Sequence, residues 1–80
     1  MIKVNILFFG ATAETTGERE IEMDFAVGVK SSDALAEIKE KFPQLNEHKL
    51  LFAVNQEYAN GDESVGNGDE LAVFTAVSGG

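Results

Sequence analysis

The stretch IKVNILFF, residues 2–9, predicts a β-strand around which the rest of the chain is organised. Apolar side chains at every second position share one face, because successive residues of a strand point to opposite sides; they are Ile2, Val4, Ile6 and Phe8. At the end of the stretch, Leu7 and Phe9 make the other face apolar as well. A strand that is apolar on both faces belongs in the middle of a sheet, so we expect neighbouring strands on both of its edges.

Residues 19–25 predict a second strand, which is exposed on one face. Its apolar positions alternate with acidic ones, so that Ile21, Met23 and Phe25 face one way and Glu20, Glu22 and Asp24 the other. Gly10 ends the first strand, and residues 11–17 form a connection of small side chains with room for one helical turn. The shortness of this connection favours an antiparallel hairpin.

Residues 31–42 carry the clearest helical pattern of the chain. Ser31 or Ser32 can cap its start, and Pro43 ends it near Phe42, because the residue before a proline avoids helical angles. At ~100° per residue three apolar side chains fall within one narrow arc: Leu35, Ile38 and Phe42. We expect this arc to pack on a sheet face built from Ile2, Val4, Ile6, Ile21 and Met23.

The rest of the chain predicts more strands, at residues 50–55, around Tyr58 and at residues 71–77, separated by Asn-Gly turn signals. A hairpin, a helix across the sheet and a last strand that returns parallel to the first make a β-grasp fold, of class α+β with a mixed sheet. The chain is expected to form one domain over residues 1–80, with a tail at 78–80. Ferredoxins share this fold, but they need cysteines, and this chain has none.

Composition excludes several function classes. The formal net charge is −8 and the six basic residues are scattered, which argues against nucleic-acid binding. The sequence shows neither a membrane span nor a signal peptide, so we expect a cytoplasmic protein. The single His48 is interpreted as a loop residue, and Glu57, Asp62 and Glu63 as solvated charges, so no metal site is expected.

The chain ends in Val77, Ser78, Gly79 and Gly80. Two glycines make the thinnest and most flexible tail that a polypeptide can have, because they carry no side chain. Such a tail can enter a narrow channel and present its terminal carboxylate to another protein. ATP can activate a carboxylate as an acyl-adenylate, which a nucleophile then attacks. A frayed end is the simpler alternative.

Four segments give the chain a resemblance to a known family: residues 7–10 (LFFG), 51–56 (LFAVNQ), 68–72 (GDELA) and 77–80 (VSGG). Together they resemble the small subunits of molybdopterin synthase, the MoaD-like ubiquitin-fold sulfur carriers. The resemblance implies that a ubiquitin-activating-like adenylyltransferase uses ATP to adenylate the Gly80 carboxylate and that sulfur then replaces AMP, giving a thiocarboxylate. It also implies that the tail, Val77 to Gly80, inserts into the large synthase subunit and donates sulfur to a pterin precursor. Gly80 would be the reacting residue, and the carrier itself would bind no cofactor.

Two departures from the family pattern leave other functions open. The chain has Ala13-Glu14 where family members commonly have Arg-Glu, and Thr75-Ala76 where they often have Pro-Pro. The alternatives are a sulfur carrier for thiamine, tungsten-cofactor, tRNA or amino-acid sulfur transfer, a ubiquitin-like modifier joined to lysine through Gly80, and a binding module with an inert tail.

Three aromatic residues predict a partner surface. Phe9, Phe52 and Phe74 cannot all be buried behind one helix. Phe74 alternates out of phase with its apolar neighbours, so it is expected on the sheet face away from the helix. We interpret the apolar patch that these residues would leave exposed as a docking site for the large subunit and the activating enzyme.

Overall fold

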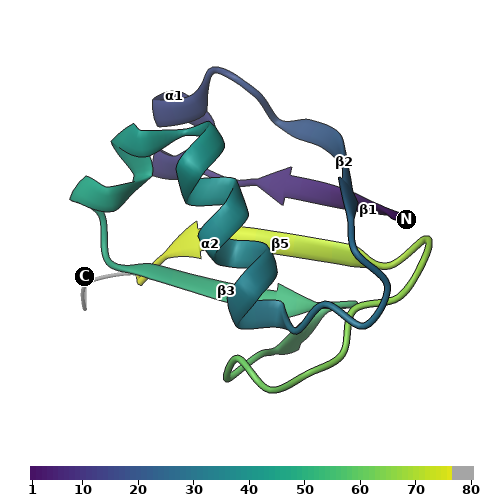
Figure 1. Cartoon of the computed structure of the whole chain (residues 1–80). Helices are drawn as coiled ribbons and strands as arrows, with labels where there is room; N and C mark the ends of the chain where they lie inside the picture. Colours follow the sequence, from purple (N-terminus) through teal and green to yellow (C-terminus); the bar gives the residue numbers. More distant parts are fainter. Residues whose placement is uncertain (77–80) are drawn as a thin grey trace.

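A single mixed sheet organises the computed structural model, which describes residues 1–76. Its strands are β1 (Ile2–Phe8), β2 (Glu20–Phe25), β3 (Leu50–Val54), β4 (Glu57–Tyr58) and β5 (Glu70–Thr75), in the spatial order β2-β1-β5-β3-β4. β1 lies inside the sheet, antiparallel to β2 and parallel to β5. The predicted α+β class and β-grasp arrangement are thus confirmed (Figure 1).

Helix α2 (Ser31–Lys41) crosses one face of this sheet (Figure 1). The core between them contains the predicted helix residues Leu35 and Ile38 and the alternate residues of β1. Ile21, Met23 and Phe42 are only partly buried but pack against that core. The Phe42 ring meets the ring of Phe8 edge-on, with 5.5 Å between the centroids.

The start of α2 differs from the expectation. Neither Ser31 nor Ser32 caps the helix; Lys30 is the N-cap residue and makes no side-chain cap. The backbone N–H groups of Ser31 and Ser32 instead donate to the carbonyl oxygens of Glu63 and Gly61, at 2.8 and 3.2 Å. The first backbone N–H groups of a helix have no acceptor within the helix. Here the loop between β4 and β5 supplies acceptors for two of them, in place of a serine side chain.

Two short helices complete the fold. α1 (Ala11–Thr16) fills the connection in which one turn was expected. The 3-10 helix η1 (Pro43–Glu47) follows α2 and was not predicted; it brings Leu45 into the core, fully buried. Proline suits the first position of a helix, where no intrahelical amide bond is lost, so Pro43 both ends α2 and begins η1.

Some predicted bounds move by a residue. β2 begins at Glu20 instead of residue 19, and β3 ends at Val54 because Asn55 and Gln56 form the turn to β4. β5 ends at Thr75, whereas the predicted strand ran to residue 77, which lies outside the described residues. No helix within residues 1–76 is both long enough and apolar enough to cross a membrane.

Candidate functional site

The candidate site is the end of the sheet from which the tail departs. The tail residues predicted to act, Val77, Ser78, Gly79 and Gly80, lie outside the described residues. The described chain leads up to them through the end of β5 and the exposed Ala76. Because β1 and β5 are parallel, the end of β5 lies beside the end of β1 and beside α1, which follows β1.

A buried threonine fixes α1 to β5. Thr12 is fully buried, and its Oγ1 donates to the carbonyl oxygen of Val73 at 2.7 Å. The same Oγ1 accepts the backbone N–H of Phe9 at 3.0 Å. A buried polar group that is satisfied in this way holds its neighbours in register, since breaking the bond would leave an unpaired carbonyl. Thr12 therefore joins the end of β1, the start of α1 and the end of β5.

An apolar groove of ≈ 380 Å³ opens next to this junction, lined by Phe9, Gly10, Ala11, Phe74 and Thr75. Phe9 is 51% exposed at one wall. Gly10 has φ 55° and ψ −119°, a conformation that side chains disfavour, and its backbone turns the chain from β1 into α1. The groove therefore lies where the chain leaves β5, directly before the tail.

Phe74 lies on the sheet face away from α2, as the alternation predicts. Its partner in the sheet register is Leu51, and its ring lies 5.8 Å from that of Tyr58, centroid to centroid. Phe74 is half-buried, and Tyr58 is 79% exposed. Phe9 and Phe74 thus come together in one apolar surface.

Phe52 does not join them. It is opposite Val73 in the register, and paired residues point to the same side of a sheet. Val73 is fully buried in the core, and Phe52 packs against that core from the helix side. The expectation that Phe52 belongs to the open face is wrong, because β3 is apolar on both faces and its alternation does not distinguish them.

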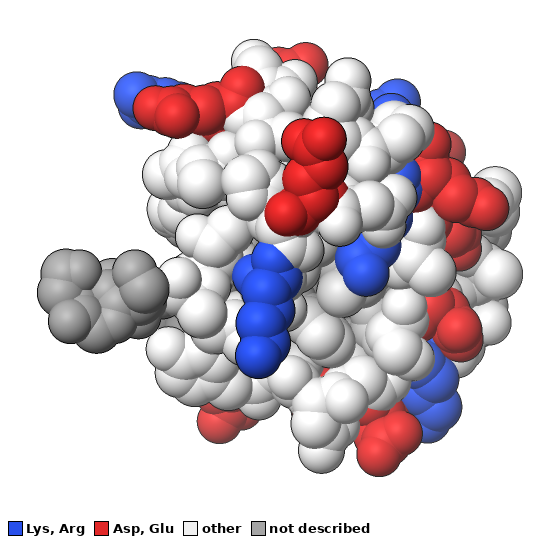
Figure 2. Space-filling model, turned by 90° about the vertical axis from the view of Figure 1, so that its left-hand side faces the viewer, with Lys and Arg blue, Asp and Glu red and all other residues white. Residues whose placement is uncertain are grey.

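A second hollow, of ≈ 580 Å³, borders the groove across Phe9. Its lining includes α1 and the connection to β2, with the charged residues Glu14, Glu18 and Arg19. Both departures from the family pattern meet these hollows: Ala13 and Glu14 line the second hollow, and Thr75 lines the groove. Figure 2 shows largely uncharged surface next to the point where the described chain ends.

Charged groups with shifted pKa values lie elsewhere. Hydrogen bonds from the Ser31 hydroxyl and from the backbone of Asn60 and Gly61 lower the pKa of Glu63 to about 2. A hydrogen bond and charge attraction to Asp24, helped by Glu22, raise the pKa of Lys3. Neither Glu63 nor Lys3 lines the groove or the hollow beside it.

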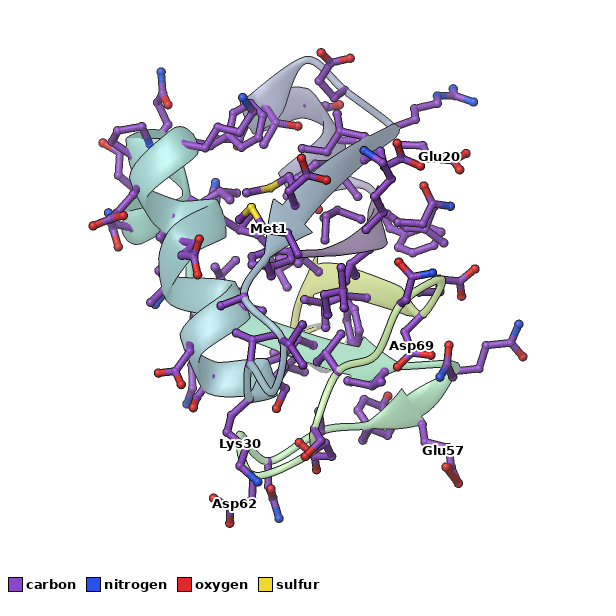
Figure 3. The ribbon with its side chains drawn as sticks, turned by 45° about the vertical axis from the view of Figure 1, so that its right-hand side comes forward. Met1, Glu20, Lys30, Glu57, Asp62 and Asp69 are labelled. Atoms are coloured by element: carbon purple, nitrogen blue, oxygen red, sulfur yellow. The ribbon has the colours of Figure 1, made fainter. Side chains whose placement is uncertain are left out.

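No group of three or more potential ligands within residues 1–76 is placed to hold a metal ion. The Glu63 carboxylate is engaged in the loop before β5, while Glu57 and Asp62 lie apart (Figure 3). His48 has a specific contact that the sequence did not indicate, because its Nε2 lies 2.9 Å from Thr15 Oγ1 and so connects η1 to α1.

Comparisons with known proteins agree with this geometry. The model of the ThiS family matches residues 6–80. The chain is similar to the molybdopterin synthase sulfur carrier subunits of Mycobacterium tuberculosis, at 38% identity over 100% of both chains, and of Haemophilus influenzae, at 39% identity over 96% of this chain and 99% of the relative.

Solved structures extend the likeness to the fold. A putative molybdopterin converting factor subunit 1 from Pyrococcus furiosus gives a TM-score of 0.89 at 26% identity, covering 96% of this chain and 100% of the other. SAMP1 from Haloferax volcanii gives a TM-score of 0.85 at 28% identity, covering 98% of this chain and 99% of the other. A complex of subunits 1 and 2 of the molybdopterin-converting factor from Helicobacter pylori contains a chain with the same fold, with a TM-score of 0.70 at 22% identity and coverage of 99% and 100%.

Proposed function

Because this chain belongs to the ThiS family, we propose that it is the sulfur carrier subunit of a molybdopterin synthase. The observation that carries the proposal is the match to named sulfur carrier subunits along the entire chain, the VSGG end included. The fold adds a second argument, since its last strand delivers the tail at one end of a rigid sheet.

The chemistry resides in the Gly80 carboxylate. A carboxylate oxygen attacks the α-phosphate of ATP on an activating enzyme, forming an acyl-adenylate and releasing pyrophosphate. Sulfur at the oxidation level of sulfide then attacks the acyl carbon and displaces AMP, leaving a thiocarboxylate. In the large subunit the acyl C–S bond breaks as the sulfur passes to a pterin precursor, and water restores the Gly80 carboxylate. The chain itself has no cysteine, so in this proposal the transferred sulfur is carried only by its end.

The described residues would act by presenting the tail. The Thr12 hydroxyl bonded to the Val73 carbonyl fixes the end of β5 against α1. Tail residues beyond that point can then extend from a rigid base into a channel of the large subunit. Because the base of the tail is already fixed, less conformational entropy is lost when the tail binds a partner, which favours affinity.

The partner is expected to dock over the groove beside the tail. Phe9 and Phe74 offer exposed aromatic surface there, and aromatic side chains commonly contribute most of the binding energy of an interface. The Helicobacter pylori complex of subunits 1 and 2 supports a large subunit as one partner. An adenylyltransferase that activates Gly80 would be the other.

A ubiquitin-like modifier is the second candidate, favoured by the likeness to SAMP1, the small archaeal modifier protein 1 of Haloferax volcanii. Both candidates begin with an activated Gly80. They differ in the nucleophile, which is sulfur for a carrier and the amine of a target lysine for a modifier. Carriers for other sulfur-transfer pathways share the thiocarboxylate and differ in the large subunit.

The mass of the chain end distinguishes these candidates. We expect the protein isolated from its own host to carry a fraction of chains heavier by the replacement of one oxygen with sulfur, located at Gly80 by fragmentation. Incubation with the large subunit and the pterin precursor should return that mass to the unmodified value. Isopeptide-linked conjugates without any thiocarboxylate would instead identify a modifier.

Removing the two glycines provides the functional test. Deletion of Gly79 and Gly80 should abolish adenylation and sulfur transfer, yet leave the melting temperature nearly unchanged, because these residues have no side chain to bury. Gly79→Val should also impair transfer, since a β-branched side chain widens the tail and stiffens it. Gly79→Ala is the matched control with a smaller side chain. A truncated protein that still supports cofactor synthesis would refute the proposal.

A further inference from the structure

β2 is an edge strand with one side unpaired. The sheet order places it outside β1, and its only strand partner among residues 1–76 is β1. The opposite edge, β4, is only two residues long, whereas β2 has six. An edge of this length offers a row of backbone donors and acceptors with which another extended chain can pair.

The register identifies which residues form that row. The Phe8 N–H donates to the Arg19 carbonyl at 2.9 Å, so Phe8 and Arg19 form a hydrogen-bonded pair. Along an antiparallel ladder such pairs recur at every second residue, so the odd-numbered residues of β2 bond to β1. The N–H and C=O groups of Glu20, Glu22 and Asp24 therefore point outward. Within residues 1–76, no loop backbone or side chain bonds to them.

The same three residues make the edge acidic. Their side chains are exposed, and Glu20 lies on the side of the sheet away from α2 (Figure 3). Lys3 is the cation paired with them, 3.1 Å from Asp24 and 3.8 Å from Glu22. Both pairs are solvent-exposed, and exposed pairs contribute little to stability, so Lys3 can exchange with an incoming cation at small cost.

These negative charges determine which kind of strand can pair with the free edge of β2. An incoming strand would pair directly with Glu20, Glu22 and Asp24, and side chains directly opposite one another share a face. A second copy of this chain, paired through its own β2, would set carboxylates against carboxylates, which is unfavourable. A segment with lysine or arginine at every second position would meet opposite charges instead.

The intervening positions add a second requirement. On the helix side of the edge, Ile21 and Met23 are partly buried and pack against the core. Residues of the incoming strand that fall beside them would cover apolar surface. We propose that the free edge of β2 binds an extended segment of a partner protein in which basic and apolar residues alternate.

This site is separate from the proposed sulfur-carrier surface. β1 lies between β2 and β5, and the groove beside the tail is formed by the end of β1, α1 and β5. A partner held along β2 would therefore leave the tail free to enter a second protein. The inference stands or fails independently of the chemistry at Gly80.

Amide hydrogen exchange followed by NMR tests the proposal on the full chain. In the free protein the amides of Ile21 and Met23 should exchange slowly and those of Glu22 and Asp24 quickly. The probe is a synthetic peptide of alternating lysine and valine, blocked at both ends, at millimolar concentration. It should slow exchange at Glu22 and Asp24 by at least tenfold. A peptide of the same composition with its lysines grouped together should have no such effect.

Three variants make the test specific. Glu22→Lys should weaken peptide binding at least tenfold, and Glu22→Pro should abolish the protection, because proline removes an outward N–H while the bonds of β2 to β1 remain. Glu57→Lys makes the same charge change on β4, at the far edge, and should alter binding less than threefold.

Certain results would overturn the inference. Equal losses from Glu22→Lys and Glu57→Lys would mean that the peptide follows net charge alone. No protection of Glu22 and Asp24 at millimolar peptide would mean that the edge does not accept a strand. Protection of these amides without peptide, in a protein that sediments as a dimer, would assign the edge to a second copy.

Discussion

At the scale of single residues, the turn between β3 and β4 carries local strain. Asn55 and Gln56 both have positive φ, at 50° and 71°, in a region that L-residues avoid. Asn55 has a compensating role, because its Oδ1 accepts the N–H of Glu70 at 3.0 Å and its own N–H donates to the Glu70 carbonyl. No side-chain hydrogen bond of Gln56 is found within residues 1–76.

We expect Gln56→Gly to stabilise the protein. Glycine relieves a left-handed strain of roughly 1–2 kcal/mol and adds unfolded-state entropy of roughly 0.5–1 kcal/mol. The net gain should be about 0.5 kcal/mol, which raises the melting temperature of so small a domain by roughly 2–4 °C. Thermal unfolding measures it. Asn55→Gly is the control and should destabilise, since it removes the bond to Glu70; a loss of stability in Gln56→Gly would contradict the strain argument.

Phe42 gives a graded test of the helix face. Its ring is only partly buried and meets Phe8 edge-on, whereas Ile38 on the same arc is fully buried. A fully buried Phe→Ala change costs on the order of 3–5 kcal/mol, so Phe42→Ala should cost about 2 kcal/mol. Ile38→Ala should cost more than Phe42→Ala in urea unfolding. A cost below about 1 kcal/mol for Phe42→Ala would mean that this ring contributes little to the core.

At the scale of elements, the loop before β5 holds the start of α2 through Glu63. Its carboxylate accepts the Ser31 hydroxyl at 2.6 Å and the N–H groups of Asn60 and Gly61 at 2.9 and 3.1 Å. These bonds are stronger to the ionised carboxylate than to the protonated one, which is why the pKa of Glu63 falls to about 2 from its ordinary value of 4.5. A depressed folded-state pKa means that protonation favours unfolding.

Stability should therefore depend on Glu63 in a defined pH window. The contribution of its charge is fully present above the ordinary pKa of 4.5 and is lost as the pH falls through about 2. Urea unfolding should show Glu63→Gln less stable than the parent at pH 6, with a difference that shrinks toward pH 2. Glu57→Gln on the exposed β4 is the control, and its difference from the parent should stay small throughout. A constant Glu63→Gln difference across this range would exclude the charge as the cause.

Local sequence patterns predict some of these elements and contacts, but not those that depend on residues far apart in the chain. The strands β1 and β2, the helix α2 and the outward face of Phe74 follow from periodicity, because each lies in a segment with a clear repeat. The parallel pairing of β1 with β5 follows from the hairpin and the crossover rule instead. Phe52 lies in LLFAV, which is apolar at every position, so only pairing with β5 decides its side. Thr12 lies in a small-residue stretch without a repeat, and its bond reaches Val73, 61 positions along the chain. Ser31 binds Glu63 across 32 positions, a contact that no local capping rule contains.

At the scale of the whole molecule, one end of the sheet gathers what a partner could recognise. Parallel pairing of β1 with β5 brings the end of β1, α1 and the departure of the tail together, although they are distant in sequence. The groove, the second hollow and the family departures at Ala13 and Thr75 all lie there. The sequence indicates Phe9 and Phe74 as partner-binding residues, but only the fold brings them into one surface at the end of β5.

We therefore expect Phe74→Ala to separate docking from folding. The ring is half-buried, and its aromatic neighbour Tyr58 is largely exposed, so truncation should cost less than about 1.5 kcal/mol of stability. Affinity for the large synthase subunit should fall more than tenfold, or about 1.4 kcal/mol, measured by calorimetry. Val27→Ala is the control, because Val27 is 79% exposed and lies outside the groove. If Phe74→Ala unfolds the protein, or if it binds the large subunit as tightly as the parent does, Phe74 is no docking residue and the groove is not the interface.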